Sequence, residues 1–573
     1  MTVFHISVGT HRTAGRFARR WFALAVPLAF VAISSAHAAI PVAERAVLLD
    51  LYNSAGGANW ANVWNLNDIG KECNWNGITC DASGVTIEGI NLDLNNLSGT
   101  LPASLNHLTN LVTVSMVENV NLAGPIPPLT GLTHLTSIAL ARSGFTGSIP
   151  SLAGLTSLQS VFFGYNQLSG PIPTLVGLTN LNSFDVTYNH LSGSIPSLTG
   201  LTNLQAFLVT SNQLTGSIPD LSDQTGLEID ADNNLFSGSL PSSQQLAHLS
   251  SLFVEGNRFS GPIPELAGIT SLTNFDVARN QLSGAIPALT GMTALQNIYV
   301  ASNQLSGAIP SLAGLTNLRT FVADHNQLSG SIPAFNGLTN LSTVYLDHNQ
   351  LTGHIPSLTG LTMLMTLQMD HNQLSGTVPP LTGLRWLGTF LIGDNKLHGP
   401  APAVPSPTTL MPFGQGSLCP NYLDPVASTD WNTITQATPW YQACTVQPVQ
   451  AMTLSPAALS VEVETAGSSA STTLTIGNAG SGDLHWSLAT AGSDCTAPGS
   501  VPWIQFTSAS SGTTAADTGS PVTLMFDAGT LVRGFYSASI CVTSDDPVQP
   551  LVRIPVNFAV EETADTIFSN GFD

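Results

Sequence analysis

Apolar residues return along most of this chain with a period of 23 residues. In the unit that begins at Leu158, the apolar positions are Leu158, Val161, Phe163, Leu168 and Ile172. The alternation from Val161 to Phe163 predicts a short strand with one face buried. A single unit cannot bury five such side chains, so the pattern predicts a solenoid in which stacked coils share one continuous core.

A proline and an asparagine mark each coil at constant positions. The prolines run from Pro127 to Pro402 at the same period, and only the step from Pro219 to Pro241 is one residue short. The Ile-Pro pair favours an extended segment on the outer side of the coil. The asparagine amide can hydrogen-bond the backbone of the sharp turn and of the next coil, so we expect a weaker contact where Ser143 replaces it. The ladder asparagines are Asn166, Asn189, Asn212, Asn234, Asn257, Asn280, Asn303, Asn326, Asn349, Asn372 and Asn395.

The run Asn-x-Leu-Ser-Gly-x-Ile-Pro resembles the plant-type leucine-rich repeats of receptor ectodomains and of secreted polygalacturonase inhibitors. The resemblance spans residues 41–445. It implies an α/β-type repeat solenoid of about 23-residue coils, with short parallel strands on the concave face. The repeats of those families are usually one residue longer, and similar units occur in secreted bacterial proteins.

The open ends of a stacked core need cover. Upstream of the coils, residues 43–52 place apolar side chains at helical spacing, and Trp60, Trp64 and Trp75 follow them. We expect these residues to cap the first coil. The expected segments are a signal sequence at 1–38, an N-terminal cap with the first coil at 39–95, the solenoid at 96–403, a C-terminal cap at 404–447, an immunoglobulin-like β-sandwich at 448–560 and a tail at 561–573.

Six cysteines fall in three pairs that are local in sequence. The segment from Cys73 to Cys80 resembles the disulfide-closed cap that precedes plant-type repeats. A metal or redox dithiol is the alternative, but the chain contains no Cys-x-x-Cys. The expected disulfides are Cys73–Cys80, Cys419–Cys444 and Cys495–Cys541.

After about residue 454 the repeat pattern stops, and short β-type runs separated by Gly, Ser and Asp begin. Such spacing predicts an antiparallel immunoglobulin-like sandwich, with Trp486 and Trp503 in its core. The segment resembles the immunoglobulin-like or BACON-like modules of secreted bacterial enzymes and adhesins, some of which are proposed to bind carbohydrate. The expected strands are Leu459–Val463, Thr472–Ile476, Leu484–Leu488, Val522–Phe526, Ser537–Val542 and Val552–Val560.

The first 38 residues have the order of a secretory signal: arginines up to Arg20, an apolar run from Trp21 to Ile33, and Ala36-His37-Ala38. No later stretch reaches the roughly 20 apolar residues of a membrane helix. We therefore expect a secreted protein that is extracellular or held at the cell surface, without a transmembrane segment after signal removal. The tail resembles the short endings of exported proteins of some proteobacteria. It is either a sorting tag or an unstructured end.

Composition narrows the function. The net charge is −21, and charged residues make up only 9% of the chain. An acidic chain poor in arginine argues against nucleic acid as a partner, because phosphates require a basic surface. The sequence contains no nucleophile elbow, zinc-protease helix or phosphate loop, so we expect no enzyme activity and no cofactor.

The ligand surface is expected on the concave sheet, where residues four, two and one places before each ladder asparagine point outward. Exposed aromatic side chains are favoured interface anchors and sugar-stacking platforms. The alternative is that isolated aromatics merely suit β-structure. The candidate ligand-binding residues are Phe162, Tyr165, Asp185, Tyr188, Asp230, Asp232, Phe253, Asp276, Tyr299 and Tyr345.

One Asp-His pair occupies the same place in three successive coils. Because strands stack about 4.8 Å apart, the three carboxylates and three imidazoles are expected to form adjacent ladders. Such ladders could bind a divalent metal ion or make binding sensitive to pH. Duplication of one repeat is the alternative explanation. The candidate metal ligands are Asp324, His325, Asp347, His348, Asp370 and His371.

These observations predict an exported, non-catalytic recognition protein that binds an extracellular protein or glycan on the concave face of the solenoid. Two alternatives stay open. By analogy with the polygalacturonase inhibitors, the chain could inhibit a secreted polysaccharide hydrolase, although fold does not determine function. It could also be an adhesive or structural component of the cell surface.

Overall fold

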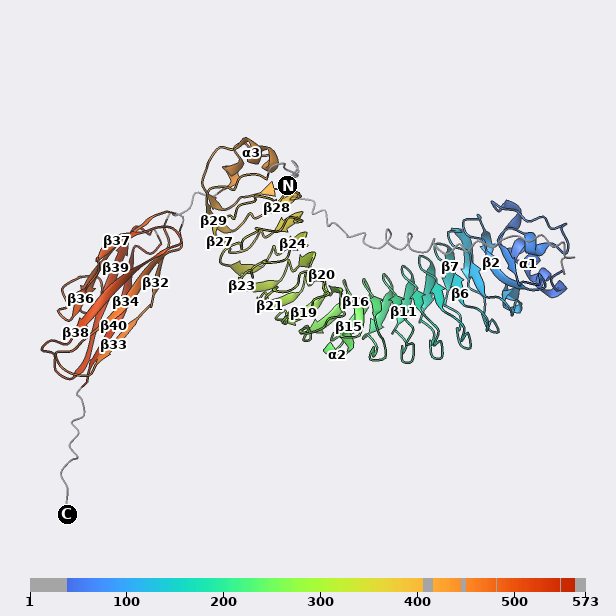
Figure 1. Ribbon diagram of the computed structural model, residues 1–573, viewed down its shortest axis with the longest axis horizontal. Coiled ribbons are helices and arrows are strands. Elements are labelled where there is room, and N and C mark those ends of the chain that lie inside the picture. The colour runs from blue at the N-terminus through green and yellow to red at the C-terminus, as the bar shows by residue number, and fades with distance from the viewer. Residues whose placement is uncertain (1–38, 406–415, 445–449, 481, 547, 562–573) are drawn as a thin grey trace, which may run out of the picture.

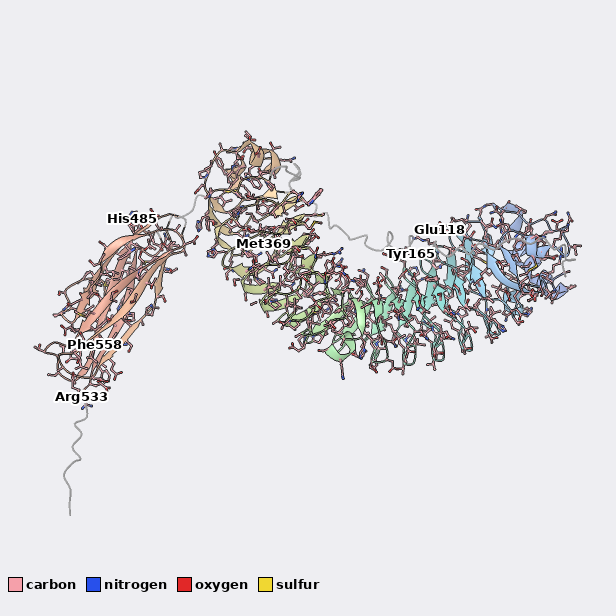
Figure 2. The ribbon with its side chains drawn as sticks, viewed as in Figure 1. Glu118, Tyr165, Met369, His485, Arg533 and Phe558 are labelled. Atoms are coloured by element: carbon pink, nitrogen blue, oxygen red, sulfur yellow. A yellow bond between two sulfur atoms is a disulfide. The ribbon has the colours of Figure 1, made fainter. Side chains whose placement is uncertain are left out.

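The structure is a computed structural model, and it describes residues 39–405, 416–444, 450–480, 482–546 and 548–561. The predicted signal sequence and all but the first residue of the predicted tail lie outside the described residues. Figure 1 shows a curved stack of coils followed by a smaller unit of β-strands. Met369 belongs to the stack, and Phe558 belongs to the smaller unit (Figure 2).

The first long sheet contains one short strand from each coil. It has 16 strands, and successive coils pair in parallel; only the first pair, in the N-terminal cap, is antiparallel. In the C-terminal half of the stack this sheet lies on the inner side of the curve (Figure 1). The strands, in sheet order, are β1 (Ile78–Cys80), β2 (Ile87–Asn91), β4 (Thr113–Ser115), β6 (Ser137–Ala139), β8 (Ser160–Phe162), β10 (Ser183–Asp185), β12 (Ala206–Leu208), β14 (Leu227–Asp230), β16 (Leu249–Phe253), β18 (Asn274–Asp276), β20 (Asn297–Tyr299), β22 (Thr320–Val322), β24 (Thr343–Tyr345), β26 (Thr366–Gln368), β28 (Thr389–Leu391) and β30 (Gly416–Ser417).

The apolar period of the sequence becomes one core that runs the length of the stack. Leu158, Val161, Phe163 and Leu168 are fully buried in it, as their spacing predicted. Corresponding residues of neighbouring coils pair in register, so that Phe184 aligns with Val161 on one side. Each coil therefore buries its apolar residues against the next one, which a single coil could not do.

A second sheet was not predicted from the sequence. Runs such as Gln-Leu-Ser-Gly and their variants form 12 further parallel strands, most of which begin directly after a ladder position. The glycine that ends such a run has a left-handed backbone, with φ of 78° at Gly170, and this conformation suits glycine at the turn that follows. The strands are β3 (Ser98–Thr100), β5 (Asn121–Pro125), β7 (Gly144–Gly147), β9 (Gln167–Gly170), β11 (His190–Gly193), β13 (Gln213–Gly216), β15 (Leu235–Gly238), β17 (Arg258–Gly261), β19 (Gln281–Gly284), β21 (Gln304–Ala308), β23 (Gln327–Ser331) and β25 (Gln350–Thr352).

The ladder asparagines bridge neighbouring coils, as predicted. The Asn280 amide donates to the carbonyls of Val254, Val277 and Ala278 at 2.9, 3.2 and 3.0 Å, and its Oδ1 accepts from the Phe259 amide at 2.9 Å. The same four bonds recur at other asparagines of the set.

The ladder is weaker where serine replaces asparagine, which confirms the expectation for that coil. The Ser143 hydroxyl reaches only the Ala141 carbonyl of its own coil, at 3.5 Å. The Leu122 amide, which would otherwise bond to this position, donates to the Asn119 carbonyl at 2.8 Å. One bridge between coils is therefore missing.

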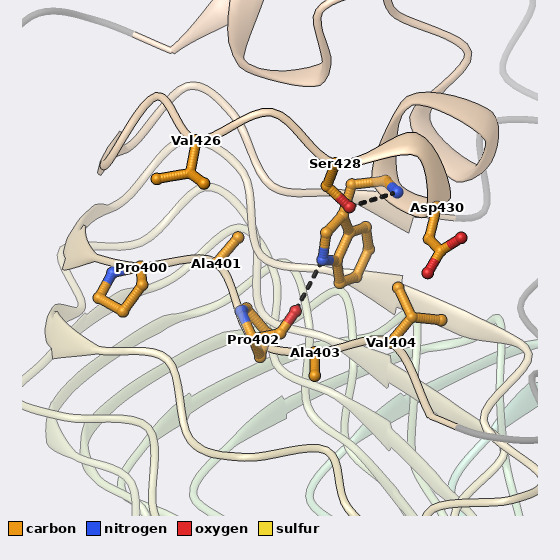
Figure 3. A pocket seen from close by; sticks show the side chains of 9 residues that line it. Pro400, Ala401, Pro402, Ala403, Val404, Val426, Ser428 and Asp430 are labelled. Atoms are coloured by element: carbon orange, nitrogen blue, oxygen red, sulfur yellow. Dashed lines mark hydrogen bonds between the residues drawn. The ribbon is translucent and has the colours of Figure 1, made fainter.

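The C-terminal end of the core is covered by helix α3 (Thr429–Thr435) and the short 3-10 helix η5 (Trp440–Ala443). The side chains of Trp431 and Trp440 are buried there. A hollow of about 390 Å³ opens beside α3 (Figure 3), and the buried Trp431 indole in its lining donates to the Pro402 carbonyl at 2.7 Å. A three-stranded sheet lies next to this cap: β27 (Ser375–Thr377), β29 (Lys396–Gly399) and β31 (Tyr422–Leu423).

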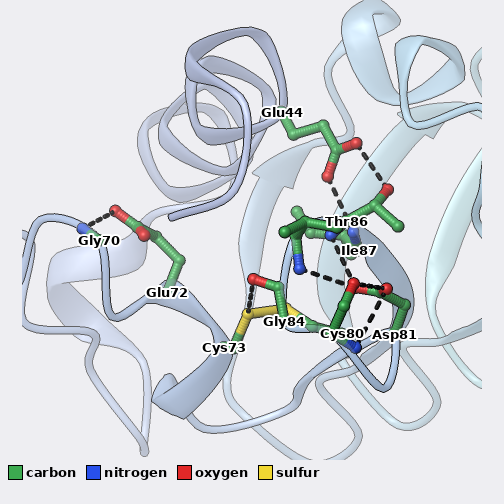
Figure 4. Close-up of a disulfide and its surroundings, with 11 residues drawn as sticks. Glu44, Gly70, Glu72, Cys73, Cys80, Asp81, Gly84, Thr86 and Ile87 are labelled. Atoms are coloured by element: carbon green, nitrogen blue, oxygen red, sulfur yellow. Dashed lines mark hydrogen bonds between the residues drawn. A yellow bond between two sulfur atoms is a disulfide. The ribbon is translucent and has the colours of Figure 1, made fainter. Parts of the chain in front are cut away.

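The N-terminal end is covered by helix α1 (Val42–Ser54), which agrees with the helical spacing of residues 43–52. Trp60, Trp64 and Trp75 are buried as expected, and their rings pack edge-on or stacked. Glu44 of α1 accepts hydrogen bonds from the Thr86 hydroxyl and the Ile87 amide at 2.7 and 2.8 Å (Figure 4). These bonds tie the helix to strand β2. The 3-10 helices η2 (Gly57–Asn59), η3 (Glu72–Asn74) and η4 (Ala103–His107) complete the region.

Replacing Arg45 with alanine is expected to lower the free energy of unfolding by about 2 kcal/mol. Arg45 Nε lies 2.7 Å from Glu72 Oε1, and Glu72 is only 1% exposed, so the variant would leave a buried carboxylate without its cation. Urea denaturation measures the change. The double variant Arg45→Ala/Glu72→Gln should recover part of the loss, because glutamine carries no charge. Equal stability of Arg45→Ala and the parent would contradict this account.

The C-terminal unit consists of two sheets around a separate core. The core contains Trp486, and Trp503 packs against it, as predicted. Each of the six expected runs falls within a strand. The first sheet has the order β32 (Met452–Ser455), β34 (Ser469–Asn478), β38 (Gly519–Asp527) and β36 (Ile504–Phe506), and the second has the order β33 (Leu459–Val463), β40 (Leu551–Val560), β39 (Gly534–Ser544), β35 (Leu484–Ala491) and β37 (Ser511–Thr514).

One strand pair departs from the antiparallel arrangement that the spacing predicts. Strand β33 runs parallel to β40, whereas the other pairs of these two sheets are antiparallel. The chain leaves the edge of the first sheet at Ser455 and enters the edge of the second at Leu459. Strand β33 therefore lies beside β40 at the edge of the second sheet and runs in the same direction as β40.

All six cysteines form the three predicted disulfides, Cys73–Cys80, Cys419–Cys444 and Cys495–Cys541. Two of them lie in the caps, and the third joins a loop of the C-terminal unit to strand β39. Among the residues that the structure describes, no helix is long and apolar enough to cross a membrane.

Candidate ligand-binding face

The concave face is the side of the 16-stranded sheet that points away from the main core. Most of its side chains come from three positions of each coil, four, two and one places before the ladder position, and Glu228 joins them from six places before. These positions change character along the stack, and four groups follow one another from the N-terminal end. They are an aromatic ladder, an acidic patch, an apolar cluster and an Asp-His ladder.

The aromatic ladder consists of Glu118, Arg142, Tyr165 and Tyr188, one residue from each of four successive coils. The Tyr165 and Tyr188 rings stack with centroids 4.5 Å apart, and the Arg142 guanidinium lies 4.5 Å from the Tyr165 centroid. Arg142 Nε is 3.8 Å from Glu118 Oε1. Figure 2 labels Glu118 and Tyr165 in the N-terminal part of the stack. Burial raises the pKa of Tyr165, so its phenol stays neutral at physiological pH.

The residue directly before each ladder position has a left-handed backbone, which non-glycine residues seldom adopt. Its φ is 58° at Tyr165, 52° at Tyr188 and 53° at His348. This repeated conformation places the side chains of successive coils side by side. Aromatic and imidazole rings at this position of successive coils therefore stack, both in the aromatic ladder and in the Asp-His ladder.

The acidic patch occupies the middle of the face. Asp230 and Asp276 are only 7% and 6% exposed, and Phe253 pairs with both of them across the strands. The coil with the shortened step contributes β14, whose register against β16 shifts between Leu227 and Glu228. The members of the patch are Asp185, Glu228, Asp230, Asp232, Glu255 and Asp276.

Some patch oxygens accept hydrogen bonds from neighbouring coils. Asp230 accepts from the Thr210 hydroxyl, and Asp232 Oδ1 accepts from the Glu255 amide at 2.5 Å. Two described cations act on the patch: Arg279 Nη1 lies 3.6 Å from Glu255 Oε1, and the charge of Arg142 favours ionisation of Asp185. The patch therefore contains far more negative than positive charge.

Burial and mutual repulsion disfavour ionisation of these carboxyls. Burial raises the pKa of Asp232 well above its ordinary value, and the charges of Asp230, Asp276 and Glu255 raise it further. Burial also raises the pKa of Asp230, although the hydrogen bond from Thr210 opposes the shift. The pKa values of Asp185 and Glu228 are raised chiefly by burial as well. The patch holds costly negative charge, which a bound cation would stabilise.

The apolar cluster corrects one expectation. Tyr299 was expected to be exposed with no core to fill, but it is only 7% exposed. It packs with Ala278, Ala301, Val322 and Tyr345 in a small core on the concave face of the sheet, separate from the main core. The small alanines two places before the ladder asparagine leave room for the ring. Tyr299 therefore stabilises the face and offers little surface to a ligand.

The other predicted aromatics are less exposed than expected. Phe162, Tyr165, Phe253 and Tyr345 are half-buried, and only Tyr188, at 40%, is well exposed. Neighbouring coils cover the flanks of each ring because the strands are close together. The predicted aromatic residues are therefore partly covered rings rather than a stripe of free ones.

The Asp-His ladder brings together all six predicted residues. The rings of His325, His348 and His371 are stacked or tilted with successive centroids 4.2 Å apart. Asp347 Oδ2 lies 2.9 Å from His348 Nδ1 and 3.8 Å from His325 Nδ1. The carboxylates thus alternate with imidazoles along the end of the face.

Sequence reasoning missed several contacting residues. Arg142, Glu255, Arg279 and Asp394 were not selected, because only aromatic, Asp and Asp-His positions were considered. Asp394 Oδ2 lies 2.5 Å from His371 Nδ1 and ends the Asp-His ladder. A reading of every residue directly before the ladder position would have found Arg142, Arg279 and Asp394.

No protein-family model matches the chain. The receptor-like kinase TMK2 of Arabidopsis thaliana is 31% identical over 120 residues, which cover 21% of this chain and 12% of the kinase. Polygalacturonase inhibitor 1 of Oryza sativa subsp. japonica is 30% identical over 127 residues, which cover 21% of this chain and 37% of the inhibitor. The chain thus spans only a minor part of both relatives.

The crystal structure of PEPR1-AtPEP1 superposes with a TM-score of 0.60 at 29% identity, covering 66% of this chain and 55% of that chain. The solenoid is a leucine-rich repeat. The predicted fold class is thereby confirmed, together with the resemblance to plant receptor ectodomains and polygalacturonase inhibitors. Neither relative matches this leucine-rich repeat over its own full length.

Proposed function

We propose that this chain is an exported, non-catalytic recognition protein whose leucine-rich repeat holds a segment of an extracellular protein on the concave face. The segment carries lysine or arginine side chains that enter the acidic patch. The acidic patch itself carries this proposal. Its carboxyls are buried or half-buried, and the pKa values of Asp230 and Asp232 are raised because each charge is poorly solvated and repels its neighbours.

A cationic ligand relieves both costs. An ammonium or guanidinium group replaces the missing water and offsets the repulsion between carboxylates such as Asp230 and Asp232. Phe253 lies between Asp230 and Asp276 across the strands, and its ring supplies apolar contact for the ligand's side-chain stems. An acidic face of this kind also raises the rate at which a basic partner associates.

The related proteins support a protein as the ligand. The rice relative is named as an inhibitor of polygalacturonase, and the superposed structure is PEPR1-AtPEP1. Inhibition of a secreted polysaccharide hydrolase is a special case of this function, in which a basic segment of the hydrolase lies on the face. A role as an adhesive surface component is the second alternative, for which the C-terminal unit supplies a separate module.

Selection of ligands tests this function directly. Residues 39–573 are screened against a displayed library of random peptides and, in parallel, against an array of glycans. We expect the selected peptides to be enriched in lysine and arginine, and their affinity to fall as salt is raised. Selection of glycans alone, or of peptides without basic residues, would contradict the proposal.

A further inference from the structure

We propose that His325, Asp347 and His348 form a binding site for one divalent transition-metal ion of the Zn²⁺ class. The site lies at the C-terminal end of the concave face, beyond the apolar cluster. It does not depend on the proposed protein ligand, because all three donors belong to this chain. Its test therefore uses the metal ion alone.

The geometry places three donor atoms around one point. One nitrogen from each of His325 and His348 and one oxygen of Asp347 lie within 4.8 Å of one another. Donors around a single zinc ion are separated by about 3–3.5 Å, given metal–nitrogen distances of about 2.0–2.1 Å. Small rotations of the two exposed imidazoles suffice to close this difference. The backbone of the two coils is held by the ladder asparagines, so the donors approach without a change of fold.

Asp347 is the fixed centre of the site. It is only 7% exposed, and its Oδ2 faces both imidazoles, at 2.9 Å from His348 Nδ1 and 3.8 Å from His325 Nδ1. Both rings expose more than a third of their side-chain surface. An ion held here keeps coordination positions open to water on the concave side, as in sites with two imidazoles and one carboxylate.

Neighbouring carboxylates orient the ligands. Asp324 Oδ2 lies 3.0 Å from His325 Nδ1, and its Oδ1 is buried without a hydrogen-bond partner among the described residues. A carboxylate that accepts from the other nitrogen of a metal-bound imidazole fixes the ring and raises its basicity. With Asp324 at Nδ1, the nitrogen of His325 that binds the ion is Nε2. Asp324 is therefore a positioning residue.

A second group, His348 with Asp370 and His371, overlaps the first at His348. His371 is already held by Asp394, with 2.5 Å between Nδ1 and Oδ2, and Asp370 is farther from its ring, at 3.7 Å. The first group is therefore the better site. Since His348 is shared, we infer one ion per chain.

The donor set defines the ion. Imidazole nitrogens with a carboxylate suit Zn²⁺, Cu²⁺ and Ni²⁺, whereas Mg²⁺ and Ca²⁺ prefer sites made wholly of oxygen. Zn²⁺ is the probe of choice because it has no preferred geometry of its own. Ca²⁺ and Mg²⁺ serve as negative probes.

The backbone conformation of His348 permits a substitution that removes the imidazole and keeps the fold. His348 has φ of 53°, and asparagine tolerates this region better than most residues. Asn233, with the same φ, already occupies the equivalent place in another coil. His348→Asn therefore removes the imidazole with little strain. His134→Asn is the matched control, since it removes an exposed imidazole far from the ladder.

Isothermal titration calorimetry with ZnCl₂, on residues 39–573 without a polyhistidine tag, tests the site. We expect one Zn²⁺ per chain in the parent and in His134→Asn, loss of binding in His348→Asn and Asp347→Asn, and about tenfold weaker binding in Asp324→Asn. Thermal unfolding without metal confirms that each variant is folded.

Three results would overturn the proposal: no Zn²⁺ binding by the parent, equal Zn²⁺ affinity of His348→Asn and the parent, or binding of Ca²⁺ or Mg²⁺ at comparable affinity. Loss of Zn²⁺ in Asp370→Asn with retention in Asp347→Asn would place the ion in the second group and would likewise reject the site proposed here.

Discussion

Replacing Asn280 with alanine is expected to lower the free energy of unfolding by about 4 kcal/mol. Asn280 is buried and makes four hydrogen bonds, two of which reach the preceding coil. Its removal leaves the Val254 carbonyl and the Phe259 amide without partners inside the core, and each unsatisfied buried group costs about 1–3 kcal/mol. Urea denaturation, followed by circular dichroism, measures the loss.

Two matched variants separate the ladder from a general effect of asparagine. Asn317 also bonds to a neighbouring coil, through the Thr293 carbonyl at 2.8 Å, but it is exposed. Asn317→Ala is therefore expected to cost less than about 1 kcal/mol, because water replaces the bond. Ser143→Asn should stabilise the chain by about 1 kcal/mol by restoring the missing bridge. Similar losses for Asn280→Ala and Asn317→Ala would show that the ladder does not hold the coils together.

The double variant Asp230→Asn/Asp232→Asn is expected to weaken binding of a cationic peptide at least about 30-fold, which corresponds to about 2 kcal/mol. Asparagine keeps the acceptor oxygens that Thr210 and the Glu255 amide use, so the local bonds survive. What is lost is the negative charge that attracts the ligand. Fluorescence anisotropy with a selected peptide measures the change.

The same variant is expected to change how stability depends on pH. The folded-state pKa values of Asp230 and Asp232 lie above their unfolded values, so folding favours the protonated forms. The stability that protonation provides is fully present below about pH 4, the unfolded pKa, and is lost as the pH rises through the raised values. At pH 7 the variant should be about 1 kcal/mol more stable than the parent, with little difference near pH 4.

Binding should follow the opposite trend. A cationic ligand needs the ionised carboxylates, so its affinity for the parent should increase as the pH rises through the raised pKa values, whereas the variant should show a flatter profile. Glu265→Gln is the control, because it removes one exposed carboxylate outside the acidic patch. If Glu265→Gln weakens binding as much as the double variant, net charge rather than the patch attracts the ligand.

Most of the solenoid could be predicted because its period leaves few choices. Once Leu158, Val161 and Phe163 are recognised as inward residues, stacking of equal coils follows, and the asparagine bridges follow from the turn. The second sheet was missed because a short Gln-Leu-Ser-Gly run has no periodicity of its own. Its strands exist only through pairing with the next coil. Such pairing is a tertiary effect that local patterns do not contain.

The concave face was predicted less well. The alignment of Asp324, Asp347 and Asp370 followed from equal coil lengths. The burial of Tyr299 did not, because it depends on which small residues its neighbours contribute, here Ala278 and Ala301. The contact between Arg142 and Tyr165 likewise depends on the left-handed backbone directly before the ladder position. Each such contact depends on side chains from two or three neighbouring coils, so the sequence of a single repeat does not predict it.

Hydrogen–deuterium exchange with the tightest selected peptide tests the central claim most directly. Because the proposed ligand lies over the acidic patch, we predict slower exchange in strands β12 to β20 of the 16-stranded sheet and in the residues that follow each of them. Exchange in β13 to β21 of the second sheet should change little, and the C-terminal unit should be unaffected. Protection confined to the second sheet or to the C-terminal unit would contradict a ligand site on the concave face.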